Sequence, residues 1–441
     1  MKGIRKMINP LKRIVELQKN NIPVGIYSAC SANEYVIRAV LKKAKDTNSV
    51  CLIEATANQV DQNGGYTNMT PKDFYNFVIK FAKEINLDTN KVFLGGDHLG
   101  PLTWTHLNEK EAMENATILI RDYVLAGFTK IHVDTSMKVN DDDPNTRLSD
   151  EIIARRGAYL VSVANNAYNE LLKTNPKAIK PVYIVGSEVP IPGGQTSSSG
   201  LNEMQITSVN DLDNTINTFK NAFKSINIED LWEDVIGIVV QPGVEEKDAG
   251  CTEYNRTKAL HLKDALDKYP NLVYEGHSTD YQTKIKLKEM VEDHIAILKV
   301  GPGLTYAVRE AIFALANIEN ELIDKDNRSN FKEILDNEML KNPSKWDKYY
   351  TGSNLEIEIK RKYSFSDRCR YYLPTKQVNE SLNILLNNLK EVPLNLLSQY
   401  MPIQYTKVRE NIIDNNPESL IIDRVTNTID EYCFATNQDK I

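Results

Sequence analysis

Short apolar runs rich in valine and isoleucine recur along most of the chain, and longer segments separate them. Eight such runs occur, at residues 23–28, 50–54, 91–97, 129–134, 182–188, 235–241, 272–275 and 295–300. Helical periodicity predicts helices between and after them, at 33–45, 71–85, 109–126, 150–172, 209–225, 253–268, 281–292 and 305–318. Strands that alternate with helices predict a parallel sheet. Eight such units predict an α/β fold, a closed (β/α)8 TIM barrel over residues 1–318.

The pattern changes after about residue 318. Helical periodicity at 330–340, 378–389 and 420–432 alternates with loops rich in aromatic and basic residues. No linker rich in Gly, Ser or Pro precedes this part, so residues 319–441 are expected to form a mainly helical C-terminal extension packed on the barrel. Neither GxGxxG nor GxxxxGK[ST] occurs, which removes the strongest sequence arguments for a Rossmann or P-loop fold.

Charge, hydropathy and cysteine content argue against a nucleic-acid-binding, membrane-spanning or disulfide-bonded protein. The 441 residues carry 53 Lys+Arg against 60 Asp+Glu, a net charge of −7, which argues against nucleic acid as the main partner. No apolar run approaches the roughly 20 residues that span a membrane, and the N-terminus lacks the apolar core of a signal peptide. Five distant cysteines without a CxxC pair favour free thiols in a reducing cytoplasm.

Polar residues gather at the carboxyl ends of the expected strands, where barrel enzymes carry their chemistry. A barrel built for stability alone does not need a carboxylate, imidazole or amide at nearly every strand end. The set therefore predicts an active site. Its members, in chain order, are Ser28, Cys30, Glu54, Asn58, Gln59, Asp97, His98, His132, Asp134, Ser136, Glu188, Gln241, Glu275, His277 and Lys299.

Two of the six histidines lie in sharp strand-end motifs. His98 follows Asp97 beside two glycines, and His277 follows the seventh strand. Two such imidazoles can bind a divalent metal, with a carboxylate or carbonyl as third ligand and a position left for substrate. Either imidazole alone favours a hydrogen-bonded structural residue, and it is the pair at the barrel mouth that favours a metal. His132 lies one pleat deeper, which favours a supporting or core role. The others fall in helical or loop segments: His106, His261 and His294.

The eighth strand runs through a tight Gly-Pro-Gly turn into a helix. Loops after strands seven and eight form the usual phosphate site of barrels, because backbone N–H groups and a helix N-terminus meet an anion there. Ser278, Thr279, Gly301 and Gly303 are therefore candidate phosphate ligands, although a tight turn without a ligand has the same sequence. Lys299 is either a Schiff-base former with a ketose or the ion-pair partner of a strand-end carboxylate.

Long motifs in a fixed order run nearly from end to end of the chain. They are GIYSACSAN (25–33), IEATANQVDQNGGYTNMTP (53–71), LGGDHLGP (94–101), AGFTKIHVDTSM (126–137), GSEVPIPGG (186–194), VVQPGVE (239–245), EGHSTDYQT (275–283), AILKVGPGLTYAVREA (296–311), YSFSDRCRYY (363–372) and LLSQYMPIQY (396–405). On these motifs the sequence resembles the GatZ/KbaZ family, the tagatose-1,6-bisphosphate aldolase subunits that are sometimes labelled tagatose-6-phosphate kinases. The motifs are specific for the family and much less so for the activity.

The resemblance implies a distant relation to the metal-dependent class II ketose-bisphosphate aldolases, where an Asp-His pair after an apolar strand supplies the catalytic acid/base and a zinc ligand. It implies Asp97 in proton transfer, and His98 and His277 as ligands of a divalent metal, most simply Zn²⁺. The third aldolase histidine has no clear match, because the sixth strand ends in Gln241. Glu188 and Gln241 are candidates for that ligand, and Glu188 is also a candidate general base.

The resemblance also implies a phosphorylated ketohexose as substrate and a class II catalytic subunit as partner. A homo-oligomer is expected as well, and neither a membrane nor nucleic acid is expected as a partner. The residues expected to bind the substrate are Ser28, Glu54, Asn58, Gln59, Asp134, Gln241, Ser278, Thr279, Lys299, Gly301 and Gly303. Arg368 and Arg370 either reach a substrate phosphate or a neighbouring subunit, or belong to a surface ion-pair network.

Three functions fit these residues. Ketose cleavage between C3 and C4 needs a polarised C2 carbonyl, which a metal supplies, and a base at the C4 hydroxyl. The chain is then an aldolase component that acts with or stabilises a catalytic subunit. Re-addition on the opposite face would instead epimerise C4, giving a self-sufficient metal-dependent 4-epimerase of a ketohexose or its phosphate. The third function is a sugar kinase, which the missing P-loop and the barrel disfavour.

Overall fold

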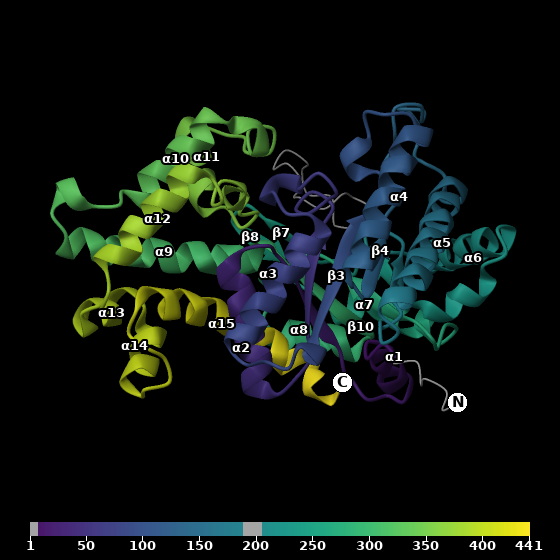
Figure 1. Cartoon of the computed structure of the whole chain (residues 1–441), viewed down its shortest axis with the longest axis horizontal. Helices are drawn as coiled ribbons and strands as arrows, with labels where there is room; N and C mark the ends of the chain where they lie inside the picture. Colours follow the sequence, from purple (N-terminus) through teal and green to yellow (C-terminus); the bar gives the residue numbers. More distant parts are fainter. Residues whose placement is uncertain (1–7, 188–204) are drawn as a thin grey trace.

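The computed structural model describes residues 8–187 and 205–441 (Figure 1). Within these ranges eight parallel strands close a barrel, with β10 pairing back onto β1, which confirms the (β/α)8 fold. The barrel strands are β1 (Ile26–Cys30), β2 (Cys51–Thr56), β3 (Val92–Leu99), β4 (Lys130–Val133), β5 (Val182–Val185), β6 (Val235–Val240), β9 (Val273–Gly276) and β10 (Ile295–Val300). The third strand thus ends two residues later than expected.

Helices between the strands cover the outside of the barrel (Figure 1). Polar caps start most of them: Asn33, Asn108, Ser149 and Ser208 each accept a backbone N–H of the first helical turn. Thr70 forms a capping box ahead of a proline at the first helical position. The helices are α2 (Glu34–Thr47), α3 (Pro71–Glu84), α4 (Glu109–Ala126), α5 (Asp150–Thr174), α6 (Val209–Ser225), α7 (Arg256–Leu266) and α8 (Lys284–Glu292).

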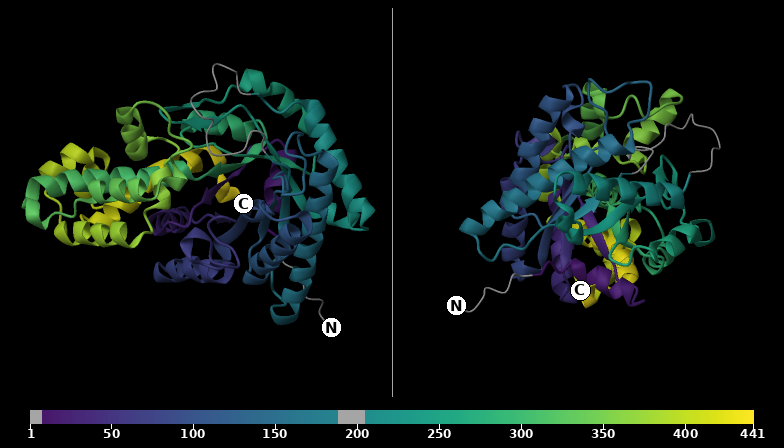
Figure 2. Two further views of the ribbon diagram at one scale, coloured as in Figure 1. Left: turned by 90° about the horizontal axis from the view of Figure 1, so that it is seen from above. Right: turned by 90° about the vertical axis from the view of Figure 1, so that its right-hand side faces the viewer.

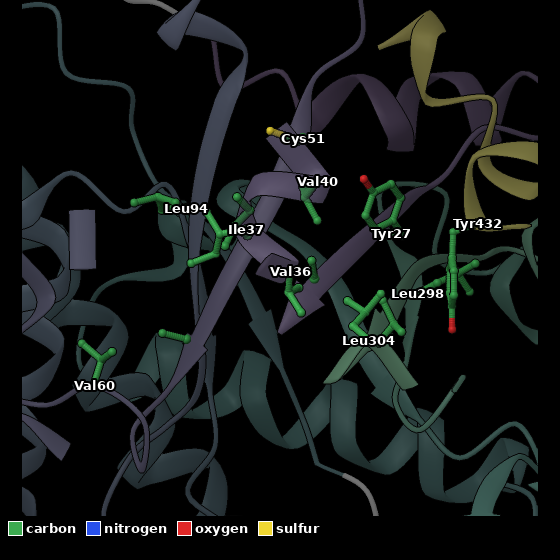
Figure 3. Close-up of a cluster of buried hydrophobic side chains, with 14 of the residues drawn as sticks. Tyr27, Val36, Ile37, Val40, Cys51, Val60, Leu94, Leu298, Leu304 and Tyr432 are labelled. Carbon is green, nitrogen blue, oxygen red and sulfur yellow. The ribbon is translucent and has the colours of Figure 1, made fainter. Parts of the chain in front are cut away.

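Apolar side chains form two cores. The larger core lies between the strands and the covering helices, and Figure 3 shows the part around Tyr27, Ile37 and Leu298. The smaller core fills the barrel interior at the amino ends of the strands, where Leu11, just before α1 (Lys12–Lys19), and Ile14, within it, close the core. The apolar filling at this end leaves the polar interior positions at the carboxyl ends, where the site lies.

The last helix of the chain returns to the barrel. The helix after β10, α9 (Pro302–Leu322), leads into α10 (Phe331–Lys341), α11 (Asn354–Tyr363), α12 (Lys376–Asn388), α13 (Leu394–Tyr400), α14 (Pro402–Arg409) and α15 (Pro417–Thr436). These helices form a lobe beside the barrel (Figures 1 and 2), and α15 packs against α2, α8 and β1. The boundary expected at residue 318 lies inside α9, and both sides of it belong to the larger core.

A short antiparallel hairpin that the sequence pattern did not predict follows β6. Its strands are β7 (Glu245–Lys247) and β8 (Gly250–Thr252). Asp248, between the two strands, accepts hydrogen bonds from the Phe365 N–H (3.0 Å) and the Ser364 hydroxyl (2.9 Å), which joins the hairpin to the C-terminal lobe. In the described ranges, no helix combines the length and apolar character that a membrane crossing needs.

Candidate functional site

A cavity of about 730 Å³ opens at the carboxyl ends of the barrel strands. One wall comes from the strand ends and the loops that follow them, including Asp97, His98, His277 and Lys299. The other wall comes from α9, α12 and the 3-10 turn Arg368–Tyr371 of the C-terminal lobe. The volume lies in the range of small-molecule sites. Both parts of the chain therefore build one cavity.

Four side chains meet at the inner end of this cavity. The potential ligand atoms of Asp97, His98, His132 and His277 all lie within 4.8 Å of one another. The ring centroid of His98 is 4.9 Å from those of His132 and His277, which are themselves 5.2 Å apart. We call these four residues the histidine cluster. It brings a third histidine, His132, beside the two that the sequence motifs single out as metal ligands.

A backbone distortion in β3 brings the adjacent residues Asp97 and His98 together. Neighbouring residues on a regular strand face opposite sides of the sheet. The pairing of β3 with β4 shifts register between Gly96 and Leu99, and His98 has a positive φ of 49°. A bulge of this kind re-aims a side chain, so both residues contribute to the cluster. Non-glycine residues in the left-handed region often mark functional sites.

Each imidazole of the cluster hydrogen-bonds away from the centre. His98 Nδ1 lies 2.7 Å from an Asp134 carboxylate oxygen, and His277 Nε2 lies 3.0 Å from a Glu275 carboxylate oxygen. His132 Nε2 lies 3.0 Å from the Gly186 carbonyl oxygen. We assign a proton to each of these nitrogens, because their partners only accept. The second nitrogen of each ring is the one left to bind a metal, as in carboxylate–histidine–zinc sites, and for His98 it does so once the metal has displaced its proton.

Two bare acceptors face each other at the centre. His132 Nδ1 accepts the His98 backbone N–H at 3.2 Å and lies 2.9 Å from Asp97 Oδ1. An ionised carboxylate and an unprotonated ring nitrogen at this distance need a proton or a cation between them. Three imidazole nitrogens and a carboxylate form a donor set that suits Zn²⁺. The residues present therefore fit a divalent metal.

A network of buried ion pairs adjoins the histidine cluster. Glu54 contacts both Lys130 (2.7 Å) and Lys299, and Lys130 also pairs with Glu275 at 2.6 Å. Lys299 lies 2.9 Å from Asp97 Oδ2. Burial alone would lower the pKa of Lys299, but Asp97 and Glu54 raise it well above its ordinary value. The amine is therefore a held cation, as the ion-pair interpretation expects, and not a free Schiff-base nucleophile.

The same contacts set the protonation of the cluster. Burial would raise the pKa of Asp97, but Lys299 and His98 hold it well below its ordinary value. Burial would lower the pKa of His98, but Asp97 and Asp134 raise it to about 9. Burial lowers the pKa of His277 to about 4 despite the hydrogen bond to Glu275. Without a metal, His98 is thus protonated beside Asp97 and Asp134, and a divalent cation that binds there would displace the extra proton.

Of the remaining residues expected to bind substrate, some line the cavity and others do not. Those in its wall are Asn58, Gln59, Ser278, Lys299 and Gly301. Glu54 and Ser28 lie fully buried in the barrel, Asp134 orients His98, and the Thr279 hydroxyl donates to the Lys299 carbonyl oxygen at 2.6 Å. The Gln241 side-chain oxygen accepts the N–H groups of Gly243 and Val244, away from the cluster. Glu188 lies outside the described residues.

The amino end of α9 holds a carboxylate of the chain itself. Asp280 Oδ1 accepts the N–H groups of Gly301 (3.0 Å) and Gly303 (2.7 Å), the groups expected to bind phosphate. Burial and the nearby Glu246 raise the pKa of Asp280 to about 7. Sequence reasoning missed Asp280 and Glu246, because only the fold brings the hairpin to the α9 turn. It also favoured a supporting or core role for His132, whose ring the structure places in the histidine cluster.

Fold and cluster together define a (β/α)8 barrel protein with a metal-type histidine and aspartate centre at the carboxyl ends of its strands. The chain belongs to the family described as D-tagatose-1,6-bisphosphate aldolase subunit GatZ/KbaZ-like, whose sequence profile matches residues 11–437. This confirms the resemblance drawn from the motifs.

A solved structure agrees with this assignment, and two others are less similar. A probable tagatose 6-phosphate kinase from Sinorhizobium meliloti 1021 is 38% identical, with a TM-score of 0.84 over 93% of this chain and 100% of that chain. The YdjI aldolase from Escherichia coli K12 is 11% identical (TM-score 0.42, 83% and 96% covered). The fructose-bisphosphate aldolase from Campylobacter jejuni is 13% identical (TM-score 0.39, 86% and 91% covered). The last two likenesses are too slight to support an argument about function.

Proposed function

We propose that the chain acts in metal-assisted aldol chemistry on a phosphorylated ketohexose, as a component of class II D-tagatose-1,6-bisphosphate aldolase. His98, His132 and His277 would hold the divalent metal, most simply Zn²⁺, and Asp97 would move the proton. One observation carries the proposal: three imidazoles donate their outer N–H groups to fixed acceptors, and their other nitrogens gather with a carboxylate within 4.8 Å of one another beside a ligand-sized cavity. Family membership supports the choice of substrate.

The residues around the cluster suit cleavage between C3 and C4. A divalent cation bound there supplies Lewis acidity toward the C2 carbonyl oxygen. Asp97 takes the proton of the C4 hydroxyl, the C4 carbonyl forms, the C3–C4 bond breaks, and its electron pair moves toward the C2 carbonyl oxygen. Lys299 holds Asp97 ionised before this step. A proton delivered to C3 completes the release of two triose phosphates.

A second candidate function is the 4-epimerisation of a ketohexose or its phosphate. It is favoured by the presence of the three imidazoles, Asp97 and Lys299 in a single chain, so that the chemistry needs no residue from another subunit. Rotation of the cleaved aldehyde and re-addition on its other face would invert C4 with the same groups. The kinase name of the Sinorhizobium relative is less well supported, since the sequence has no P-loop motif.

The test is to incubate the purified chain alone with D-tagatose 1,6-bisphosphate and with fructose 6-phosphate, with Zn²⁺ and with chelator. Triose phosphate formation supports the aldolase, and tagatose 6-phosphate from fructose 6-phosphate supports the epimerase. Either activity should fall at least about 100-fold in His98→Ala and be unchanged in the matched His106→Ala, whose imidazole is exposed. Turnover that begins only when a class II catalytic subunit is added, and that His98→Ala leaves intact, would leave this chain an accessory role.

A further inference from the structure

The amino end of α9 is poorly suited to bind a substrate phosphate. Asp280 already accepts the N–H groups of Gly301 and Gly303, and its side chain is buried. A phosphate brought to these groups would have to displace the Asp280 carboxylate or share their N–H groups with it. The usual anion site of the barrel is therefore filled by the chain itself.

Arg370 is a cation in the wall of the same cavity that lacks a charged partner. Its guanidinium donates to the carbonyl oxygens of Ser366 (2.5 Å) and Asp367 (3.1 Å) and to the Tyr371 hydroxyl (3.0 Å). These three acceptors are uncharged. Among the residues that the structure describes, no carboxylate forms an ion pair with Arg370, which is half-buried and lines the cavity. Its position is thus fixed while its charge is left uncompensated.

Two of the most deeply buried guanidinium groups in the described ranges have carboxylate partners. Arg156 contacts Asp142 at 2.8 Å and Glu109 at 2.9 Å, and Arg309 contacts Asp367 at 3.0 Å. Pairing is expected, because a charge removed from water is costly unless a counter-charge compensates it. Arg370 lacks such a partner, and it lies in the wall of a cavity where a ligand can supply the anion.

We infer that Arg370 binds the phosphate group of the substrate, so that the C-terminal lobe, and not the α9 turn, supplies the anion site. The inference rests on the proposed function for the nature of the substrate. A planar guanidinium presents parallel N–H groups that match two phosphate oxygens. The guanidinium of Arg370 is held in position before a ligand binds. It donates to backbone carbonyl oxygens and stacks over the Tyr371 ring, 4.5 Å from the ring centroid.

Two acidic residues line the same cavity and bear on this assignment. Glu246 and Asp280 lie within electrostatic range of Arg370, beyond ion-pair distance. Burial and Glu246 raise the pKa of Asp280 to about 7, so Asp280 itself is only partly ionised near neutrality. Neither carboxyl group forms an ion pair with Arg370, and its guanidinium therefore remains available to a phosphate dianion.

The test measures binding and not turnover, so that it is independent of the proposed activity. Zn²⁺-loaded full-length protein is titrated with fructose 6-phosphate, with fructose and with inorganic phosphate by calorimetry. Arg370→Gln should weaken binding of fructose 6-phosphate and inorganic phosphate by roughly tenfold to a hundredfold, and Arg370→Lys by less. Fructose binding and Zn²⁺ affinity should be unchanged. Arg409→Gln, an exposed arginine outside the cavity, is the charge-matched control and should behave as the parent protein.

Unchanged phosphate binding in Arg370→Gln would overturn the inference, and so would an equal loss for fructose and fructose 6-phosphate, which indicates a structural role. A parent protein that binds neither fructose 6-phosphate nor inorganic phosphate would overturn it as well. Phosphate binding that depends on Arg370 in a protein without turnover would uphold the inference while the proposed function fails. If Arg370→Gln loses Zn²⁺ affinity through misfolding, Arg370→Lys provides the comparison.

Discussion

At the level of single residues, His132 provides the sharpest test of the histidine cluster. The hydrogen bond from its Nε2 to the Gly186 carbonyl leaves Nδ1 toward Asp97 and His98. His132→Gln keeps most of the side-chain volume and removes the ring nitrogen. We expect its Zn²⁺ affinity, measured by competition with a chromophoric chelator, to fall at least about 100-fold.

The matched control for this substitution is His106→Gln, because His106 is exposed and outside the cluster. Its Zn²⁺ affinity should equal that of the parent protein. Thermal unfolding in chelator shows whether His132→Gln is folded, since His132 is fully buried. Equal Zn²⁺ affinity of folded His132→Gln and the parent protein would remove His132 from the centre.

Asp280 makes stability depend on pH. Its pKa is raised by burial and Glu246 from 3.8 to about 7, so the folded state binds the proton more tightly than the unfolded state. This contribution is fully present below pH 3.8 and is lost as pH rises through 7. Asp280→Asn keeps the acceptor for Gly301 and Gly303 but cannot ionise. Relative to the parent protein it should therefore gain stability between pH 4 and pH 8, by up to about 4 kcal/mol.

Urea unfolding in chelator at several pH values measures this difference in the free energy of unfolding. Asp414→Asn, on the surface, should show no such trend and serves as the control. A constant difference between Asp280→Asn and the parent protein across this range would show that Asp280 stays ionised in the folded state.

Sequence reasoning located the strand-end residues but not their contacts. Period-two alternation placed Lys130, His132 and Asp134 on one strand face, and that pattern was the available signal for His132. The same pattern could not identify Asp280 as the partner of the α9 turn, because Asp280 lies in a loop without periodicity. Its hydrogen bonds with the Gly301 and Gly303 N–H groups form only when the barrel brings the two loops together. The same holds for Arg370, which reaches the cavity from a different lobe.

Among the elements, the eight barrel strands were predictable because each is a short apolar run bounded by helical periodicity. The hairpin β7–β8 was not, since each of its strands has three residues and too little alternation to recognise. Helix α9 begins at Pro302, three residues before its expected start, because proline suits the first helical position. The difference at α9 does not change the predicted fold. Because the hairpin was not predicted, however, Glu246 could not be placed in the cavity wall.

Tyr432 links helix α15 to the loop that follows β9. Its hydroxyl donates to the Thr279 carbonyl oxygen at 2.9 Å, and its ring packs 6.0 Å from that of Tyr27. Tyr432→Phe should lower the free energy of unfolding by about 1–2 kcal/mol, because the Thr279 oxygen loses a buried donor. Tyr363→Phe, at a half-exposed ring, should change it by less than about 0.5 kcal/mol. Equal effects in urea unfolding would contradict the contact.

At the scale of the whole molecule, the C-terminal lobe completes the barrel as well as the cavity. The Gly25 N–H ahead of β1 donates to the Thr436 carbonyl oxygen at 2.8 Å, and the Gln438 side chain donates to the Val50 carbonyl oxygen at 3.0 Å. α15 covers β1, α2 and α8, in the outer layer where a separate barrel domain would place the helix after its last strand. The boundary that the sequence pattern suggests at residue 318 thus separates two periodicities, and the last helix belongs structurally to the barrel.

A chain truncated after Leu322 tests whether residues 1–318 form an independent domain. Removing α15 exposes the surface that its buried side chains cover, and those side chains are Leu420, Ile421, Val425, Ile429, Tyr432 and Ala435. Each large apolar side chain contributes about 1.5–3 kcal/mol by burial, and their sum rivals the roughly 5–15 kcal/mol by which domains are stable. We therefore expect the truncated chain to lack near-ultraviolet circular dichroism and a cooperative urea transition. In the full chain, Ile429→Ser should be strongly destabilising and Phe434→Ser, at an exposed position of the same helix, nearly neutral. A truncated chain that unfolds as cooperatively as the full chain would instead establish the barrel as a separate domain.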